Sequence, residues 1–183
     1  MTHDLYIIGA VDNSNGIGKD GKLPWHFKKE MAHFKAVTTK VGDPSKVNMV
    51  IMGRTTWESI PESFRPLEGR ANVVLTRRDD FEAPGAKVAH SFDEAIALAD
   101  DSIENIFAIG GMDIYSEAMK RDDLTGIYLT RIDADYDVDA YFPGIPADFS
   151  DIDPLGMDEE DGTSIVYLLL RPLQKSFFAP DPL

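Results

Sequence analysis

The stretch Asn48-Met49-Val50-Ile51-Met52-Gly53-Arg54-Thr55-Thr56-Trp57-Glu58-Ser59-Ile60 decides the fold class. Its short apolar run is cut by Gly53 and followed by a basic residue and two hydroxyls, as in a buried strand that turns into a helix. Free N–H groups at a helix start bind phosphate readily. Arg54 would add a full charge, and Thr55 and Thr56 could cap the turn or donate hydroxyls. An ordinary strand–helix joint with a surface arginine explains the same residues equally well.

A second joint of the same kind follows residues 106–109. This apolar run leads into Gly110-Gly111 and then into a helical pattern that starts Met112-Asp113-Ile114-Tyr115. Paired glycines let the backbone approach a ligand closely or adopt torsion angles that other residues avoid. Two glycine-marked helix starts suit a ligand with two phosphates, such as a dinucleotide. Neither joint is a G-x-G-x-x-G fingerprint or a G-x-x-x-x-G-K-[ST] loop, so a Rossmann unit or a P-loop is unsupported.

Length and composition indicate a single domain over residues 1–183. The chain is 43% hydrophobic, which suffices to bury a core. No run of 18 apolar residues exists, and no basic flank precedes the brief apolar stretch 5–8, so we expect neither a membrane span nor a signal peptide. Without cysteine the chain has no disulfide and no thiolate metal site, and we expect no metal. This composition fits a cytoplasmic protein.

The net charge of −14 argues against nucleic acid as a main partner. Residues 133–161 contain no Lys or Arg, which indicates a solvated surface. General repulsion is screened beyond about 8 Å at physiological salt, so a local arginine cluster can still receive a polyanion. The basic residues near the two motifs are Arg54, Arg65, Arg70, Arg77 and Arg78.

Strands and helices alternate along the chain. Apolar runs predict strands at residues 5–11, 48–52, 71–75, 106–109, 126–132 and 164–170, with a strand edge at 87–89. Helical patterns occur at 27–37, after Gly53, after Gly111, and at 94–99 behind the capping box Ser91-Phe92-Asp93-Glu94. Residues 12–24, 41–47 and 61–69 are predicted loops or turns. This order predicts an α/β fold with a mainly parallel sheet.

The helix predicted at residues 27–37 carries a chemical anomaly. Phe27, Met31 and Phe34 lie at i, i+4 and i+7 and form one apolar stripe toward the core. Glu30 falls on the same stripe, although carboxylates are rarely buried without a partner and an apolar site raises their pKa. Glu30 either lies at the edge of the stripe and reaches water, or meets a cationic or amide-like group of a ligand.

Taken in order, these motifs resemble dihydrofolate reductases. The resemblance rests on residues 9–12, 16–18, 23–25, Glu30, Phe34, 53–60, 65–70, 109–111, 128–133 and 142–143. It implies a single α/β domain with a central eight-stranded, mostly parallel twisted sheet, an antiparallel C-terminal strand and about four flanking helices. It also implies a monomer that reduces 7,8-dihydrofolate to tetrahydrofolate by hydride transfer from NADPH, with protonation at N5.

For the substrate, the resemblance implies that Glu30 binds the 2-amino group and ring N–H of the pterin. Trp25 and Thr130 would belong to the same catalytic group. Arg70 would pair bidentately with the α-carboxylate of the glutamate tail, a geometry that suits a guanidinium. The pterin and aminobenzoyl rings would be walled by Ile8, Met31, Phe34, Ile60 and Leu67.

For NADPH, the resemblance implies that Ala10 and Ile17 bind the nicotinamide amide by backbone, under a mobile loop at 13–23 that includes Gly18. The 2′-phosphate would be held by Arg54, Thr76 and Arg77. The pyrophosphate and neighbouring groups would be contacted by Gly53, Thr55, Thr56, Gly110, Gly111, Met112, Asp113, Ile114 and Tyr115. The Gly110–Gly111 peptide bond would be cis.

Two departures and two rival functions accompany the resemblance. Glu30 stands where most bacterial members have Asp, and residues 41–47 are longer than in compact bacterial members, so we expect them to decorate the cofactor side. A reductase of riboflavin synthesis would share the sheet and the NADPH site but would need neither Arg70 nor Glu30. A non-catalytic NADPH-binding scaffold would have no use for Glu30, Phe34 and Arg70 together.

Overall fold

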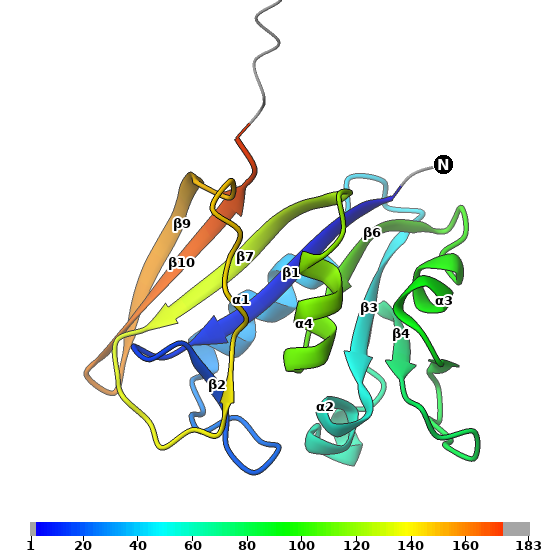
Figure 1. Cartoon of the computed structure of the whole chain (residues 1–183), viewed down its shortest axis with the longest axis horizontal. Coiled ribbons are helices and arrows are strands. Elements are labelled where there is room, and N and C mark those ends of the chain that lie inside the picture. Colours follow the sequence, from blue (N-terminus) through cyan, green and yellow to red (C-terminus); the bar gives the residue numbers. More distant parts are fainter. Residues whose placement is uncertain (1–2, 174–183) are drawn as a thin grey trace, which may run out of the picture.

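The computed structural model describes residues 3–173 and has one large sheet (Figure 1). Its eight strands lie in the order β5-β4-β3-β6-β1-β7-β10-β9. All neighbours from β5 to β7 are parallel, and β10 runs antiparallel to both β7 and β9. The mostly parallel sheet with an antiparallel C-terminal strand is therefore confirmed. The strands are β1 (Asp4–Val11), β3 (Val47–Gly53), β4 (Arg70–Leu75), β5 (Lys87–Ala89), β6 (Ile103–Ala108), β7 (Leu124–Ile132), β9 (Asp151–Glu160) and β10 (Thr163–Arg171).

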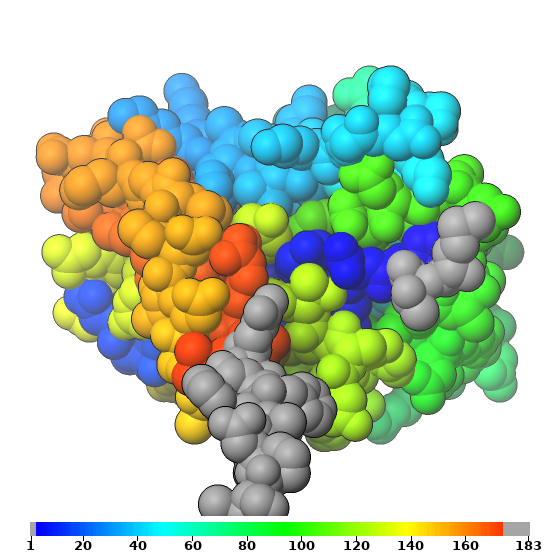
Figure 2. All heavy atoms as spheres, turned by 90° about the horizontal axis from the view of Figure 1, so that it is seen from above, coloured from blue at the N-terminus to red at the C-terminus, as the bar shows by residue number. Residues whose placement is uncertain are grey.

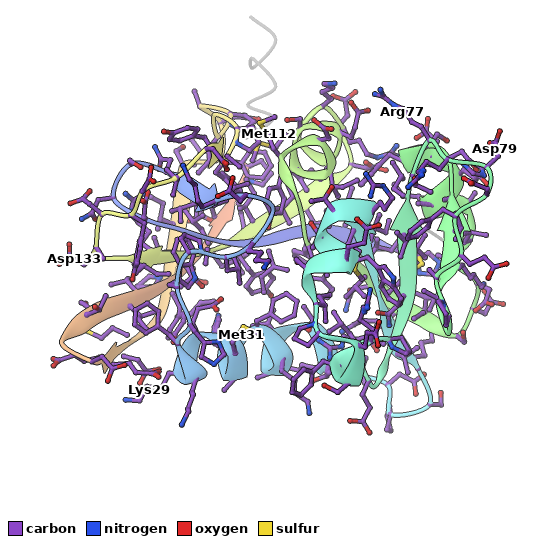
Figure 3. The ribbon with its side chains drawn as sticks, turned by 90° about the horizontal axis from the view of Figure 1, so that it is seen from below. Lys29, Met31, Arg77, Asp79, Met112 and Asp133 are labelled. Atoms are coloured by element: carbon purple, nitrogen blue, oxygen red, sulfur yellow. The ribbon has the colours of Figure 1, made fainter. Side chains whose placement is uncertain are left out.

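Helices cover both faces of the sheet. α1 (Lys28–Thr39) lies on one face, and α3 (Phe92–Ala97) and α4 (Met112–Met119) lie on the other (Figures 1 and 3). The short α2 (Arg54–Ser59) follows β3, and a 3-10 turn, η1 (Glu62–Phe64), follows α2. Connections from β1 and β3 run toward β5, whereas those from β5 and β6 run the opposite way. Right-handed crossovers then place the two groups of helices on opposite faces.

Burial on both faces explains the continuous apolar runs in the sequence. Along β1, Leu5 and Ile7 belong to the core cluster that contains α3 and α4 residues, whereas Tyr6 and Ile8 belong to the cluster on the α1 face. Strand β3 alternates between the same two clusters. Parallel strands covered on both sides read as unbroken hydrophobic runs rather than as alternation. This is why the strands near the centre of the sheet were predictable.

A buried amide fixes the end of α1 against the sheet. The Nδ2 of Asn48, at the start of β3, donates to the carbonyl oxygens of Thr38 at 3.1 Å and Lys40 at 2.8 Å. Its Oδ1 accepts from the backbone N and the Nδ2 of Asn105, at 3.1 and 3.2 Å. One side chain therefore joins α1, β3 and β6 and leaves no part of its amide unpaired.

A buried carboxylate, that of Asp12, fixes the loop after β1 by hydrogen bonds. Asp12 accepts from the N and Oγ of Ser14, from the N of Gly16 and from the N of Tyr136 at 2.7–3.2 Å. Burial alone would raise the pKa of Asp12, but these hydrogen bonds outweigh it and the pKa falls. The loop then continues into β2 (Gly16–Gly18), which pairs with β8 (Ala140–Tyr141) in a small second sheet.

Strands β2, β8 and β9 were not anticipated from the sequence. β9 is an exposed edge strand with five acidic residues, Pro154 and Gly156, and these residue types are poor strand formers. Acidic residues and Pro suit an edge, because they discourage pairing with another chain. The turn Asp161-Gly162, with φ of 53° and 77°, is a strong hairpin signal that would have revealed β9.

Two helix boundaries differ from the prediction. α1 begins at Lys28, with Phe27 as its N-cap, and continues to Thr39. α3 begins two residues earlier than expected, and its capping box is only half formed. The Oγ of Ser91 accepts from the N of Glu94 at 3.1 Å, but the Glu94 carboxylate accepts from the N of His90 at 2.8 Å instead of from Ser91.

Residues 41–47, predicted to decorate the cofactor side, lie at the other end of β3 from the Gly53 joint. This stretch leads into the amino end of β3, opposite to Gly53. The backbone N–H groups of Gly42 and Asp43 donate to the Glu104 carboxylate at 2.6 and 2.8 Å, at the start of β6. Figure 2 views this end of the sheet, with the segment in cyan at the rim. No helix within residues 3–173 is long and apolar enough to cross a membrane.

Candidate active site

The candidate site lies where β1 and β6 separate. β1 pairs with β6 only from Asp4 to Ile7, while its pairing with β7 continues to Val11. The chain leaves β1 toward α1 on one face and leaves β6 toward α4 on the other. Adjacent parallel strands whose connections go to opposite faces form a switch point, and ligands of open α/β sheets bind outside the strand ends there. Figure 3 looks onto these carboxyl ends.

The two glycine joints meet at this edge of the sheet. The N of Gly53 donates to the carbonyl oxygen of Gly110 at 2.8 Å. A Cβ placed on Gly111 would lie 3.7 Å from the Oγ1 of Thr56. The first turns of α2 and α4 therefore face each other. The Gly110–Gly111 peptide bond is cis, as the resemblance implied.

Tyr115 links α4 to β1 beneath this joint. Its hydroxyl donates to the carbonyl oxygen of Ile8 at 3.1 Å. A Cβ would lie 2.8 Å from that hydroxyl at Gly9 and 3.0 Å from it at Gly110, where φ is +108°. Only glycine therefore fits at both positions. Burial raises the pKa of Tyr115, with a smaller contribution from the Glu30 charge, so the phenol stays a neutral donor.

The start of α2 differs from the expected anion-binding turn. The N-cap is Gly53, and no side chain caps the helix, so capping by Thr55 or Thr56 is not observed. The Arg54 side chain lies along the helix, and its Nη1 pairs with the Oε2 of Glu58, one turn later, at 2.6 Å. In this arrangement the Arg54 guanidinium is engaged within its own helix.

Glu30 is buried in the first turn of α1. Its exposed fraction is 7%, which excludes the alternative of a carboxyl at the edge of the stripe. Burial raises its pKa to about 7, and no hydrogen bond or ion pair from another described residue offsets this effect. Burial raises the pKa of both Tyr115 and Tyr167, and the Glu30 charge adds a smaller contribution to each. The Glu30 carboxyl can change protonation state near neutral pH.

The apolar stripe of α1 is only partly as predicted. Phe27 is buried and Phe34 is half-buried, but Met31 is 43% exposed and is not a core residue. Met31 lies in the first turn of α1 (Figure 3). The remaining predicted wall residues fall in one cluster on the α1 face, namely Ile8, Phe34, Ile60 and Leu67.

Arg70 lies at the other end of α1. Its Nη1 donates to the Oγ1 of Thr38 at 2.8 Å and its Nε to the carbonyl oxygen of Glu68 at 3.1 Å. The guanidinium carbon is 5.9 Å from the ring centroid of Phe34, and burial lowers the pKa of the group. Glu30, Phe34 and Thr38 occur at i, i+4 and i+8, so they span about 12 Å along one helix face.

Trp25 and Thr130 are the two other residues predicted to act with Glu30, and both are buried. Thr130, on β7, is buried between Ala10 of β1 and Tyr167 of β10. No hydrogen bond joins it to Glu30 within the described residues. The Nε1 of Trp25 is buried and has no hydrogen-bond partner among the described residues. A buried donor without a partner is costly, and a bound water or ligand would relieve that cost.

No hydrogen bond or ion pair joins the side chains predicted for the 2′-phosphate to one another in the described structure. The Oγ1 of Thr76, after β4, accepts from the N of Arg78 at 3.2 Å. Arg77 is exposed at the rim of the molecule (Figure 3). Of the other predicted cofactor residues, Met112 and Asp113 are exposed at the start of α4, whereas Ile114 is buried.

Sequence reasoning missed two aromatic neighbours of Glu30. The ring of His33 stacks on Tyr167, with 3.9 Å between the ring centroids. Burial lowers the pKa of His33, and Asp158 opposes this effect. His33 lies three residues after Glu30, so helical spacing could have found it. Tyr167 comes from a distant strand, and no local pattern connects it to α1.

The comparison with known families agrees with this geometry. The family model described as dihydrofolate reductase matches residues 4–171. The chain belongs to the dihydrofolate reductase family. Dihydrofolate reductase of Heliothis virescens is 46% identical over 147 residues, which cover 77% of this chain and 80% of that protein. Dihydrofolate reductase of Drosophila melanogaster is 37% identical over 174 residues, which cover 90% and 96%.

A bifunctional relative shows how the same unit occurs within a longer protein. Bifunctional dihydrofolate reductase-thymidylate synthase 1 of Arabidopsis thaliana is 44% identical over 147 residues, which cover 76% of this chain but 28% of that protein. As a member of the dihydrofolate reductase family, the chain is an oxidoreductase. Family membership implies a folate substrate and a nicotinamide cofactor.

The Glu30 carboxyl predicts an unusual pH dependence of stability. Its pKa rises from 4.5 to about 7 on folding, so the folded protein loses stability as the pH rises through this interval. Above the interval, ionisation costs about 3 kcal/mol, which Glu30→Gln avoids. We expect the free energy of unfolding of this variant, relative to wild type, to increase by about 2–3 kcal/mol as the pH is raised from about 5 to about 8. Urea unfolding without ligands measures this difference. The exposed Glu159→Gln should show no such change, and a pH-independent difference for Glu30→Gln would contradict the assignment.

Proposed function

We propose that this protein reduces 7,8-dihydrofolate to 5,6,7,8-tetrahydrofolate with NADPH. The observation that carries the proposal is the row along α1. A buried carboxyl with a raised pKa stands at one end, Phe34 in the middle, and the half-buried Arg70 at the other end. Dihydrofolate presents a pterin edge rich in N–H groups, then an aromatic ring, then a carboxylate. The family membership supports the same substrate.

In this proposal the pterin lies against the first turn of α1. Glu30 accepts hydrogen bonds from the 2-amino group and the ring N–H, and the unpaired Nε1 of Trp25 donates to a water or to the substrate. The exposure of Met31 suits the wall of an open site better than a place in the core. Ile8, Phe34, Ile60 and Leu67 supply the remaining apolar surface. Arg70 takes the α-carboxylate of the glutamate tail.

The glycine joints suit the nicotinamide cofactor. Gly53 and Gly111 are partly exposed and present backbone without side chains, and the start of α4 offers N–H groups to phosphate. In this proposal Ala10, on β1, and Ile17, on β2, bind the carboxamide by backbone. The choice of NADPH rests on Arg54, Thr76 and Arg77 as ligands of the 2′-phosphate. When bound, the cofactor supplies the hydride.

The residues of this chain provide binding and electrostatics. C6 of the pterin accepts a hydride more readily once N5 carries a proton. Glu30 holds the pterin tautomer and stabilises the positive charge that develops as N5 takes a proton from water. Glu30 is not assigned as the direct proton donor to N5. Burial of both rings excludes bulk water, which strengthens the interaction with the carboxyl.

The central test is the absorbance of NADPH at ~340 nm in the presence of dihydrofolate. We expect wild-type protein to oxidise NADPH only when dihydrofolate is present. Glu30→Gln should lower hydride transfer by about two to four orders of magnitude at neutral pH, because a neutral amide cannot stabilise the developing charge. NADPH affinity should hardly change, and acid pH should restore part of the rate. A Glu30→Gln variant with wild-type turnover would exclude the assigned role.

Arg70→Lys tests the tail contact. Lysine cannot reproduce the planar pairing, so we expect the KM for dihydrofolate to rise about 10- to 100-fold. Turnover at saturation should fall less, since the contact is remote from C6 and acts in the ground and transition states alike. An antifolate without a glutamate tail provides the control. If its affinity falls as much as that of dihydrofolate, Arg70 has a structural role and the tail binds elsewhere.

Arg54→Ala and Arg77→Ala test the choice of cofactor. Each charge-assisted contact to the 2′-phosphate is worth roughly 1.5–3 kcal/mol, so NADPH should bind about 10- to 100-fold more weakly while NADH is little affected. Titration with both cofactors measures the difference. Arg78→Ala is the matched control, because Arg78 is adjacent and its Nε lies 3.9 Å from an Asp80 oxygen. Equal losses for NADPH and NADH would assign these arginines another role.

A further inference from the structure

The first turn of α1 receives its cap from a distant part of the chain. The N-cap residue Phe27 makes no side-chain cap. Instead, the backbone N–H groups of Lys28 and Lys29 donate to the two carboxylate oxygens of Glu160 at 2.9 and 2.8 Å. The first N–H groups of a helix have no partner within it, and a carboxylate there is favoured by both hydrogen bonding and charge. Glu160 therefore does what a local Ser, Thr, Asp or Asn usually does.

The same hairpin holds the side chains of this turn. The Nζ of Lys29 donates to the carbonyl oxygen of Glu159 at 3.0 Å and lies 3.5 Å from the Asp158 carboxylate. Asp158 also accepts from the hydroxyl of Tyr167 at 3.1 Å. The Tyr167 ring stacks on His33, one turn further along α1. In Figure 3 the tip of the β9–β10 hairpin, in orange, lies beside the first turn of α1 near Lys29.

The hairpin that carries Glu160 has a well-defined tip. Asp161 and Gly162 both have positive φ, at 53° and 77°, and Glu160 pairs directly with Thr163 across them. This is the two-residue turn whose twist matches that of the flanking strands. The register of nine residue pairs with β10 then determines where the Glu160 carboxylate lies.

We propose that Glu160 is a positioning residue for Glu30. The role rests on the proposed function, in which Glu30 binds the pterin. Two hydrogen bonds to consecutive N–H groups fix the direction of the first turn of α1, and Glu30 is the next residue. Without them these N–H groups turn to water and the first turn frays. A displacement of about 1 Å at a reacting group can cost about 100-fold in rate.

The charge of Glu160 gives the proposal a second readout. The ionisable groups around Glu30 are Tyr115 of α4, Tyr167 of β10, His33 of α1, the acidic hairpin residues 158–160, and the flanking Lys28 and Lys29. A carboxylate at the start of the helix opposes ionisation of another carboxyl in the same turn. Removing Glu160 should therefore lower the pKa of Glu30.

The experiment compares Glu160→Ala and Glu160→Gln with the matched control Glu159→Ala. Glu159 contributes only its backbone carbonyl to α1, so its variant removes a neighbouring charge and keeps the contact. Hydrogen exchange without ligands should be faster at the start of α1 in Glu160→Ala and unchanged in Glu159→Ala. Single-turnover hydride transfer at saturation should fall about 10- to 100-fold in Glu160→Ala, with its pH profile shifted to lower pH. Glu160→Gln keeps one acceptor and should recover part of the rate.

Three results would overturn the proposal. They are wild-type exchange at the start of α1 in Glu160→Ala, equal effects of Glu159→Ala and Glu160→Ala, and a loss of thermal stability with an unchanged hydride rate and pH profile. If wild-type protein does not reduce dihydrofolate, the proposed function is excluded. Hydrogen exchange would still decide whether Glu160 holds the helix, so the two failures can be told apart.

Discussion

The burial of the Glu30 carboxyl without an ion-pair partner among the described residues is the constraint on which the rest of the site depends. An apolar site makes ionisation of this carboxyl costly. The helix that carries it is held at both ends by side chains from other parts of the chain. Glu160 binds the first N–H groups of α1 and Asn48 binds its last carbonyl groups. Between these two ends, Phe34 packs with the cluster on that face of the sheet. A helix fixed at both ends can keep a buried carboxyl in a defined position even though its ionised form is unfavourable there.

The sheet explains how one helix could contact both ends of the proposed substrate. α1 starts near the carboxyl ends of the parallel strands and runs back to the start of β4, where Arg70 contacts Thr38. The row formed by Glu30, Phe34 and Thr38 therefore runs from the switch point toward the amino ends of the strands. The glycine joints stay at the carboxyl ends, held together by the Gly53–Gly110 hydrogen bond. The two halves of the site are thus positioned by different elements, and only the parallel arrangement brings them together.

The sequence predicted those features that depend on neighbours along the chain. Burial on both faces produces unbroken apolar runs, and helical spacing identified Glu30 as an acid on an apolar stripe. It did not predict the exposure of Met31, because that depends on which distant elements pack against the first turn of α1. It did not predict β9, an edge strand whose acidic residues resemble a solvated loop. The contact of Glu160 with α1 joins residues more than 130 positions apart, beyond the reach of any local pattern.

The excess of acidic residues therefore does more than keep the surface solvated. Several carboxylates accept hydrogen bonds from backbone N–H groups, and hydrogen bonding lowers their pKa values in spite of any burial, as at Asp12, Asp43, Asp100, Glu104 and Glu160. These groups stabilise the fold above their unfolded pKa values, and that stabilisation is lost as the pH falls. Glu30 has the opposite sign, because its stabilisation is present in acid and is lost as the pH rises toward about 7. The fold thus combines ionised acids, which hold its loops and helix ends by hydrogen bonds, with one buried acid, Glu30, that takes up a proton as the pH falls below about 7.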